Sequence, residues 1–284
     1  MKKLTLCWLV LAVTLLTGCF GNNVPGTASP ATDETAAVLS DGAYFAVSEE
    51  YSNGWKDFIA FTVTDGRIVS ATWDGLPQNG SELKSTVAAA GGYSMKSAGA
   101  QYEWDEQARN FAQALIDAQG LPVTELDENG KTDAIAGVTI KVNEVCRLYE
   151  EALSQGPMPA GEYQDGLYYA QAPQYDNNGY AETVAMYISG GRIVWVNWDG
   201  VREDSEETKK SIGDGYGLKS KSSIGAEWYE QAQAFEAYVI ENQGIANLTL
   251  GDDGKTDAIS GCTITISGAC TLAEQILAEA QVAG

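Results

Sequence analysis

The chain has 284 residues, and 39 acidic against 17 basic side chains give it a formal net charge of −22. A surface this acidic repels nucleic-acid phosphates, so we expect no nucleic-acid partner. The chain contains no histidine, which excludes the Ser-His-Asp triad, histidine zinc sites and CxxCH haem attachment. We therefore predict no metal site and no catalytic residue, and any redox chemistry must come from another bound cofactor.

The first residues have the pattern of an export signal. Two lysines precede an apolar run at 4–16, which is too short and wrongly flanked for a membrane-spanning helix. The run closes with the letters LTGC, ending at Cys19, and this resembles the bacterial lipobox. The resemblance implies a signal peptide at 1–18 and a lipid on Cys19, followed by a flexible linker at 19–40. An ordinary secretory signal with an incidental cysteine is the alternative.

The remaining chain is a tandem repeat with an offset of about 124 residues. This period is far longer than that of a solenoid, so each copy should have its own core. We expect one domain at 41–157 and a second at 163–284. Four stretches carry the match: Asp41 to Tyr44 with Asp165 to Tyr168, Gly66 to Gly75 with Gly191 to Gly200, Glu103 to Ala108 with Glu227 to Ala232, and Gly130 to Ile135 with Gly254 to Ile259.

In chain order, the first element predicted in each copy is a β-hairpin. Apolar residues alternate at 59–63, and Asp65-Gly66 then turns the chain back, with a Gly-Gly pair in that place in the second copy. A stretch rich in glycine and serine follows, at 86–102 and 211–226, and is typical of an irregular loop.

Two helices complete each copy. The apolar spacing from Trp104 and Trp228 onward predicts amphipathic helices, which Gly120 and Gly244 would end. The candidate N-caps of the last helices are Asn143 and Ser267. The expected fold class is therefore α+β, with two tandem copies of a small antiparallel sheet packed by helices.

The segment before each last helix carries the most specific pattern. It reads DAIAGVT in the first copy and DAISGCT in the second. This resembles the FMN-binding domain family, whose signature is Asp, two residues, Ser or Thr, then Gly-Ala-Thr. In that family a flavin transferase joins the phosphate of FMN to the hydroxyl of the final threonine, which implies two covalent FMN cofactors here. The implied acceptors are Thr139 and Thr263, and the implied flavin-site residues around them are Asp133, Gly137, Asp257, Ser260 and Gly261.

The pattern also makes chemical sense by itself. A phosphoryl acceptor needs a free hydroxyl and close approach of another protein, and a glycine before it leaves room for that approach. The N-terminus of the following helix favours a phosphate. Ala136 stands where the signature has Ser or Thr, so we expect Thr139 to be the weaker acceptor. A plain turn leading into a capped helix is the alternative.

Aromatic and sulfur-containing residues could contribute to such a site. Four tryptophans could stack on a flavin ring, yet core packing is the favoured role: Trp73, Trp104, Trp198 and Trp228. The Gly-rich loops hold side chains that could cover a flavin: Tyr93 and Met95, and Tyr216 and Leu218. Cys262 precedes an acceptor, and we expect its thiol to be unreactive.

With its lipobox, the chain resembles the two-domain flavinylated lipoproteins of Gram-positive extracellular electron transfer. We expect a lipid-anchored protein on the extracellular face of the cell membrane. Its flavins would carry electrons from a membrane donor to an external acceptor such as iron or free flavin. The alternatives are a flavin-dependent surface reductase with a defined organic substrate and a cofactor-free surface binding lipoprotein.

Overall fold

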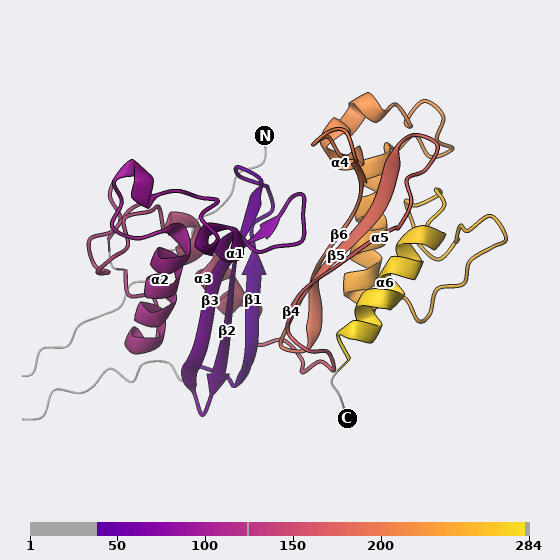
Figure 1. Cartoon of the computed structure of the whole chain (residues 1–284). Helices are drawn as coiled ribbons and strands as arrows, with labels where there is room; N and C mark the ends of the chain where they lie inside the picture. Colours follow the sequence, from indigo (N-terminus) through magenta and orange to yellow (C-terminus); the bar gives the residue numbers. More distant parts are fainter. Residues whose placement is uncertain (1–38, 124, 282–284) are drawn as a thin grey trace, which may run out of the picture. The chain divides into compact units, whose positions relative to one another are not determined.

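The computed structural model describes residues 39–123 and 125–281. The predicted signal peptide, Cys19 and most of the predicted linker lie outside these residues. Within the described part of the chain, no helix combines the length and the apolar character that crossing a bilayer requires. The described residues form two three-stranded antiparallel sheets with helices, so the predicted α+β class is confirmed (Figure 1).

The two copies have the same order of elements. In the first copy these are β1 (Gly42–Val47), β2 (Trp55–Thr64), β3 (Arg67–Pro77), α1 (Lys84–Ala89), the short 3-10 helix η1 (Lys96–Ala98), α2 (Trp104–Ala118) and α3 (Asn143–Gln155). In the second copy they are β4 (Gly166–Gln171), β5 (Tyr180–Ser189), β6 (Arg192–Arg202), α4 (Lys209–Ile212), η2 (Gly213–Tyr216), α5 (Trp228–Asn242) and α6 (Ser267–Glu279). The stretches predicted as irregular loops therefore contain short helices.

The predicted hairpin is present in both copies, and a third strand is added to it. Asp65 and Gly66 have φ of 51° and 70°, the left-handed conformation that a tight hairpin turn requires. The carboxylate of Asp41 accepts hydrogen bonds from the backbone N–H groups of both residues, at 3.0 and 2.8 Å. Asp165 makes the same two contacts to the Gly190-Gly191 turn. This contact explains why an aspartate precedes the first strand of each copy.

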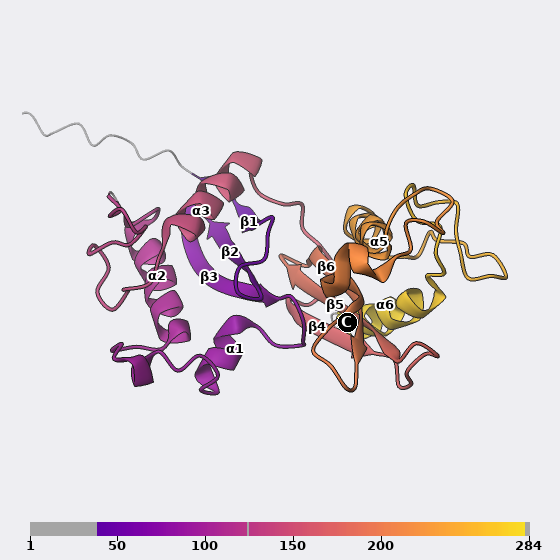
Figure 2. The ribbon, with the colours of Figure 1, turned by 90° about the horizontal axis from the view of Figure 1, so that it is seen from above.

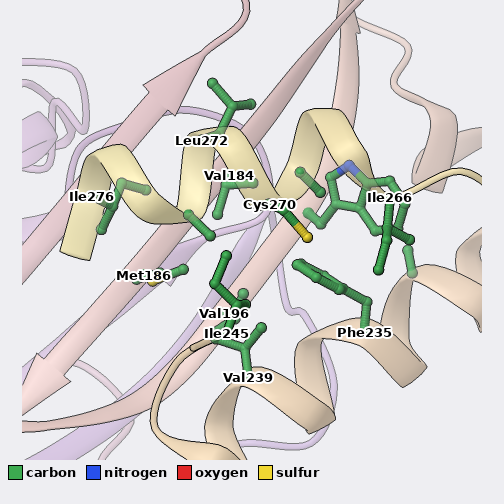
Figure 3. Packing of buried hydrophobic residues seen from close by; sticks show 14 of the residues in the cluster. Val184, Met186, Val196, Phe235, Val239, Ile245, Ile266, Cys270, Leu272 and Ile276 are labelled. Atoms are coloured by element: carbon green, nitrogen blue, oxygen red, sulfur yellow. The ribbon is translucent and has the colours of Figure 1, made fainter. Parts of the chain in front are cut away.

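Each copy has a core of its own. Helix α2 packs over β3 and α3 packs over β1 and β2, so both cover one face of the first sheet (Figure 2). In the second copy α5 lies over β6 and α6 over β4 and β5. Figure 3 shows this second core, where Met186, Phe235 and Ile276 contribute side chains from the sheet, α5 and α6. Each copy thus contributes the residues of one main core.

The tryptophans pack in these cores, as favoured from the sequence. The Trp73 ring lies edge-on to Trp104, with centroids 5.5 Å apart, and 5.2 Å from Phe111. Trp198 and Trp228 form the matching pair in the second copy, at 5.1 Å. All four are less than 7% exposed, so they are structural members of the cores.

The predicted ends of the helices were wrong in detail. Gln119 and Gln243, rather than the following glycines Gly120 and Gly244, take the left-handed conformation that ends α2 and α5, with φ of 57° and 56°. The Gln119 amide is hydrogen-bonded to both the N–H and the C=O of Ile68, at 2.9 and 3.1 Å. These two bonds to the sheet stabilise a conformation that glycine would otherwise adopt more readily.

Asn143 and Ser267 are the first residues of their helices and not the N-caps. The cap positions belong to Val142 and Ile266, and neither has a side chain that can accept a hydrogen bond. The carbonyl of Gly130 accepts the N–H of Val142 at 2.8 Å, and the equivalent glycine carbonyl accepts the N–H of Ile266 at 2.9 Å. A backbone carbonyl therefore holds the residue that precedes each helix, and neither helix has a side-chain cap.

A third apolar cluster contains residues from both copies. Phe45, Phe58 and Leu76 of the first sheet pack with Ala185, Tyr187 and Trp195 of the second. The rings of Phe58 and Tyr187 have centroids 4.6 Å apart. Cutting the chain between the copies leaves both main cores intact but exposes this cluster.

Separate fragments of residues 41–157 and 163–284 are therefore expected to fold and then to re-associate. Circular dichroism should show a cooperative thermal transition for each fragment, and sedimentation should show a complex when the two are mixed. Two unfolded fragments beside a folded full chain would contradict the assignment of one core to each copy.

Candidate functional site

The two candidate acceptors lie in equivalent bends, four positions before α3 and α6. Thr139 is exposed and Thr263 is half-buried. Each is preceded by one turn of backbone whose isoleucine, Ile135 or Ile259, enters the core. Both threonines therefore lie on turns held by a buried isoleucine, and Thr139 is the more exposed of the two.

A buried glutamine holds each acceptor turn. The Oε1 atom of Gln107, in α2, accepts hydrogen bonds from the N–H of Thr139 at 2.8 Å and from its hydroxyl at 3.2 Å. Gln231, in α5, makes the same two contacts to Thr263, at 2.8 and 3.1 Å. The two glutamines are 1% and 0% exposed, so water does not compete for these bonds.

The Gly-rich loop is tied to the same end of α2. The carboxylate of Glu103 accepts hydrogen bonds from the N–H groups of Met95 and Lys96, at 2.7 and 3.0 Å. It also forms a capping box with Glu106, whose side chain bonds the Glu103 N–H at 2.8 Å. In the second copy Glu227 holds Leu218 and Lys219 in the same way. The repeated sequence at 103–108 and 227–232 thus joins loop, helix and acceptor turn.

Of the loop residues predicted to cover a flavin in the first copy, Met95 lies near the acceptor turn and Tyr93 packs against the core. Met95 packs partly on the core and its sulfur lies 3.9 Å from Nε2 of Gln107, so this loop does reach the acceptor site. Tyr93 packs on Trp104, with ring centroids 6.5 Å apart. The Lys96 ammonium is paired with Glu106 at 2.5 Å.

Open hollows adjoin the acceptor turns. In the first copy a hollow of about 520 Å³ is lined by Lys131, Thr132, Asp133 and Thr139, among others. Its counterpart in the second copy measures about 580 Å³ and includes Asp257 in its wall, without Thr263. These volumes fall in the range of small-molecule sites. Asp133 and Asp257 are exposed, and each follows a threonine whose hydroxyl accepts the N–H of the next residue but one.

The signature serine is present in the second copy alone, as Ser260. Ser260 and its counterpart Ala136 are both exposed. The difference that the structure does show is the greater exposure of Thr139.

The glycines of the signature are needed for conformation. Gly137 and Gly261 have φ of +80° and +84°, which L-residues with a side chain rarely adopt. A Cβ atom at Gly137 would also lie 2.7 Å from Nδ2 of Asn110, whereas at Gly261 the nearest atom would be 3.6 Å away.

Replacing either glycine by alanine should destabilise its copy by about 1–2 kcal/mol, the cost of left-handed backbone. Gly137→Ala should cost more than Gly261→Ala, because only the first also meets a neighbouring side chain. Urea unfolding of each variant measures the two costs. Equal costs would show that the contact with Asn110 relaxes freely.

The cysteines of the second copy are buried. Cys262 and Cys270 are 3% and 7% exposed, and burial raises the pKa of both thiols, to about 11 for Cys270. The half-buried Cys146 has a pKa raised to about 11 by the same cause. Thiolate is the reactive form, so these groups are protonated at neutral pH.

Alkylation of native protein at pH 8 should therefore be slower at Cys262 and Cys270 than in the urea-unfolded chain, by about a hundredfold at Cys270. Peptide-resolved mass spectrometry after iodoacetamide treatment measures each site. Rapid labelling of native Cys262 would identify it as a reactive thiol beside the acceptor.

The sequence Trp-Asp-Gly, at 73–75 and 198–200, marks a second buried polar arrangement in each copy. Burial raises the pKa of Asp74, and its Oδ1 accepts the N–H groups of Gly75 and Ser85 at 2.7 and 2.9 Å, which fixes the start of α1. Gly75 leaves room for Lys84, whose ammonium lies 4.2 Å from the centroid of Trp104. Asp199, Gly200 and Lys209 repeat this arrangement. In both copies the aspartate thus holds the turn that leads into the short helix.

No family model matches the chain. Among curated proteins it is similar to a chlorophenol reductase of Desulfitobacterium hafniense, at 29% identity over 30% of this chain and 34% of that protein. The chain thus spans about a third of that relative's length. It is also similar to a protein of Clostridium thermocellum solved by NMR, at 35% identity over 40% of this chain and 90% of that chain, with a TM-score of 0.33. A crystal structure from Clostridium perfringens matches at 21% identity over 42% of this chain and 88% of that chain, with a TM-score of 0.32.

Proposed function

We propose that this protein is a lipid-anchored extracellular electron carrier that holds one FMN on Thr139 and one on Thr263 through phosphoester bonds. The observation that carries the proposal is the acceptor geometry, which occurs twice. In each copy a threonine hydroxyl lies on a turn with a left-handed glycine, and a buried amide fixes its position.

The described residues fit a flavin phosphate in three respects. Thr139 is exposed, which leaves this residue open to a flavin transferase. The hollow beside it is large enough for a small ligand. The turn also leads into the N-terminus of α3, where the helix dipole favours negative charge. The bound flavin would supply the electron transfer, while the protein supplies attachment and orientation.

The charge of the chain and its predicted lipid anchor indicate which electron donors and acceptors fit the proposal. The net charge of −22 disfavours anionic polymers, and a small external acceptor such as chelated iron or free flavin needs no large complementary surface. The predicted lipid on Cys19 would keep the carrier near a membrane electron donor. A covalent bond suits this position, because a cofactor held only by affinity would be lost to the medium.

A second candidate is a flavin-dependent surface reductase, which the similarity to a chlorophenol reductase favours. The two candidates differ in substrate selectivity. A carrier should pass electrons to several acceptors at similar rates, whereas a reductase should turn over one organic substrate much faster than the others. Reoxidation of the reduced protein by ferric chelate, free flavin and a chlorinated phenol distinguishes them.

When the chain is produced with a flavin transferase, the intact mass should show two FMN groups. Thr139→Val and Thr263→Val should each remove one, because valine keeps the shape of the side chain and lacks the oxygen that bonds to phosphorus. The double variant should be colourless after denaturation. Unmodified peptides spanning both threonines, despite a transferase active on another substrate, would overturn the proposed function.

A further inference from the structure

We propose that Gln107 and Gln231 are positioning residues for flavin attachment, which orient the threonine hydroxyl for attack on a flavin phosphate. This inference rests on the proposed function and assigns a role to a side chain outside the signature. In each copy the hydroxyl hydrogen is directed inward, to a buried Oε1 atom 3.2 or 3.1 Å away. The oxygen lone pairs are left facing outward, toward an approaching donor.

The orientation of each glutamine amide is determined by its partners. Backbone N–H groups can only donate, so the N–H of Thr139 and of Ile140, at 2.8 and 3.2 Å, require Oε1 of Gln107 on that side. On the other side Nε2 donates to the carbonyl of Tyr102 at 3.0 Å. In the second copy Nε2 of Gln231 donates to the carbonyl of Ala226 at 3.3 Å. A flipped amide would place like groups together at both ends.

The agreement between the copies supports a role specific to the threonine. Around the acceptor the copies differ, with Val138 against Cys262 and Ala136 against Ser260. The glutamine-to-threonine distances nevertheless agree within 0.1 Å. A residue that only filled space could have changed with its neighbours.

The chemical step constrains what the glutamine does. The threonine O–H bond breaks, an Oγ1–phosphorus bond forms, and the phosphorus–oxygen bond to the nucleotide part of a flavin dinucleotide breaks, so that a nucleoside monophosphate leaves. A neutral amide cannot take up the proton, so a base of the transferase must receive it. The glutamine fixes the direction of the hydroxyl until that transfer. Afterwards the ester oxygen has no hydrogen to donate, and Oε1 retains only its backbone N–H partners.

The test uses the two sites of one chain as references for each other. Gln107→Leu should slow flavin incorporation at Thr139 by about tenfold and leave Thr263 unchanged, and Gln231→Leu should do the reverse. Peptide-resolved mass spectrometry during a transferase time course gives both rates. Gln119→Leu is the matched control, because Gln119 also joins α2 to a neighbouring segment by its amide but contacts neither threonine. It should lower the melting temperature without slowing incorporation.

Gln231→Glu separates orientation from packing. A protonated carboxyl can donate to the Ala226 carbonyl as Nε2 does and still accept from Thr263 with its other oxygen, whereas an ionised carboxylate has no hydrogen to donate and would face that carbonyl. The Thr263 to Thr139 rate ratio in this variant should therefore approach the native ratio at low pH and fall at high pH, while the native ratio stays flat. Unchanged rates in both leucine variants, or equal slowing by Gln119→Leu, would overturn the positioning role. A native chain that accepts no flavin would instead refute the proposed function.

Discussion

One buried amide in each copy connects the parts of the candidate site. Gln107 reaches from α2 to the acceptor turn 32 residues later in the chain, and to the backbone that precedes its own helix. An unpaired amide in this position would cost several hydrogen bonds that water could not replace. The helix, the Gly-rich loop and the turn must therefore assemble around it together. The sheet supports this assembly, since α2 packs along β3 and Gln119, the residue that follows α2, is hydrogen-bonded to Ile68.

The duplication, the hairpins and the acceptor turns could be predicted from the sequence because each depends on local pattern. The apolar alternation at 59–63 predicts a strand and Asp65-Gly66 predicts a turn, and neither prediction depends on distant residues. The role of Gln107 does depend on them. In sequence it is one polar residue in an amphipathic helix, and only its repetition at Gln231 marks it. The helix caps were missed for the same reason, because the partner of Val142 is the carbonyl of Gly130, twelve residues earlier.

The two copies also differ in sequence at positions outside the acceptor turns. In the second copy the buried Glu236 accepts the N–H of Trp198 at 2.6 Å and pairs with Lys210, which also donates to Asn197. Burial raises the pKa of Glu236, and the adjacent ammonium opposes that shift. In the first copy Ala112, Ser85 and Thr72 occupy these positions and line a hollow of about 440 Å³. At these positions the side chains therefore differ in charge and volume between the copies. The glutamine and the threonine of the acceptor site are the same in both.

The separation of 32 residues between glutamine and threonine also bears on the order of folding. Hairpins close over short loops and form early, while contacts between distant segments form later. The acceptor turn is complete only once α2 has docked on the sheet and buried its glutamine. An unfolded chain contains the same threonine but not the oriented hydroxyl. On the proposed function, the cofactor would thus be attached preferentially to molecules that have finished folding. A covalent flavin on either copy would show that the acceptor turn of that copy had formed.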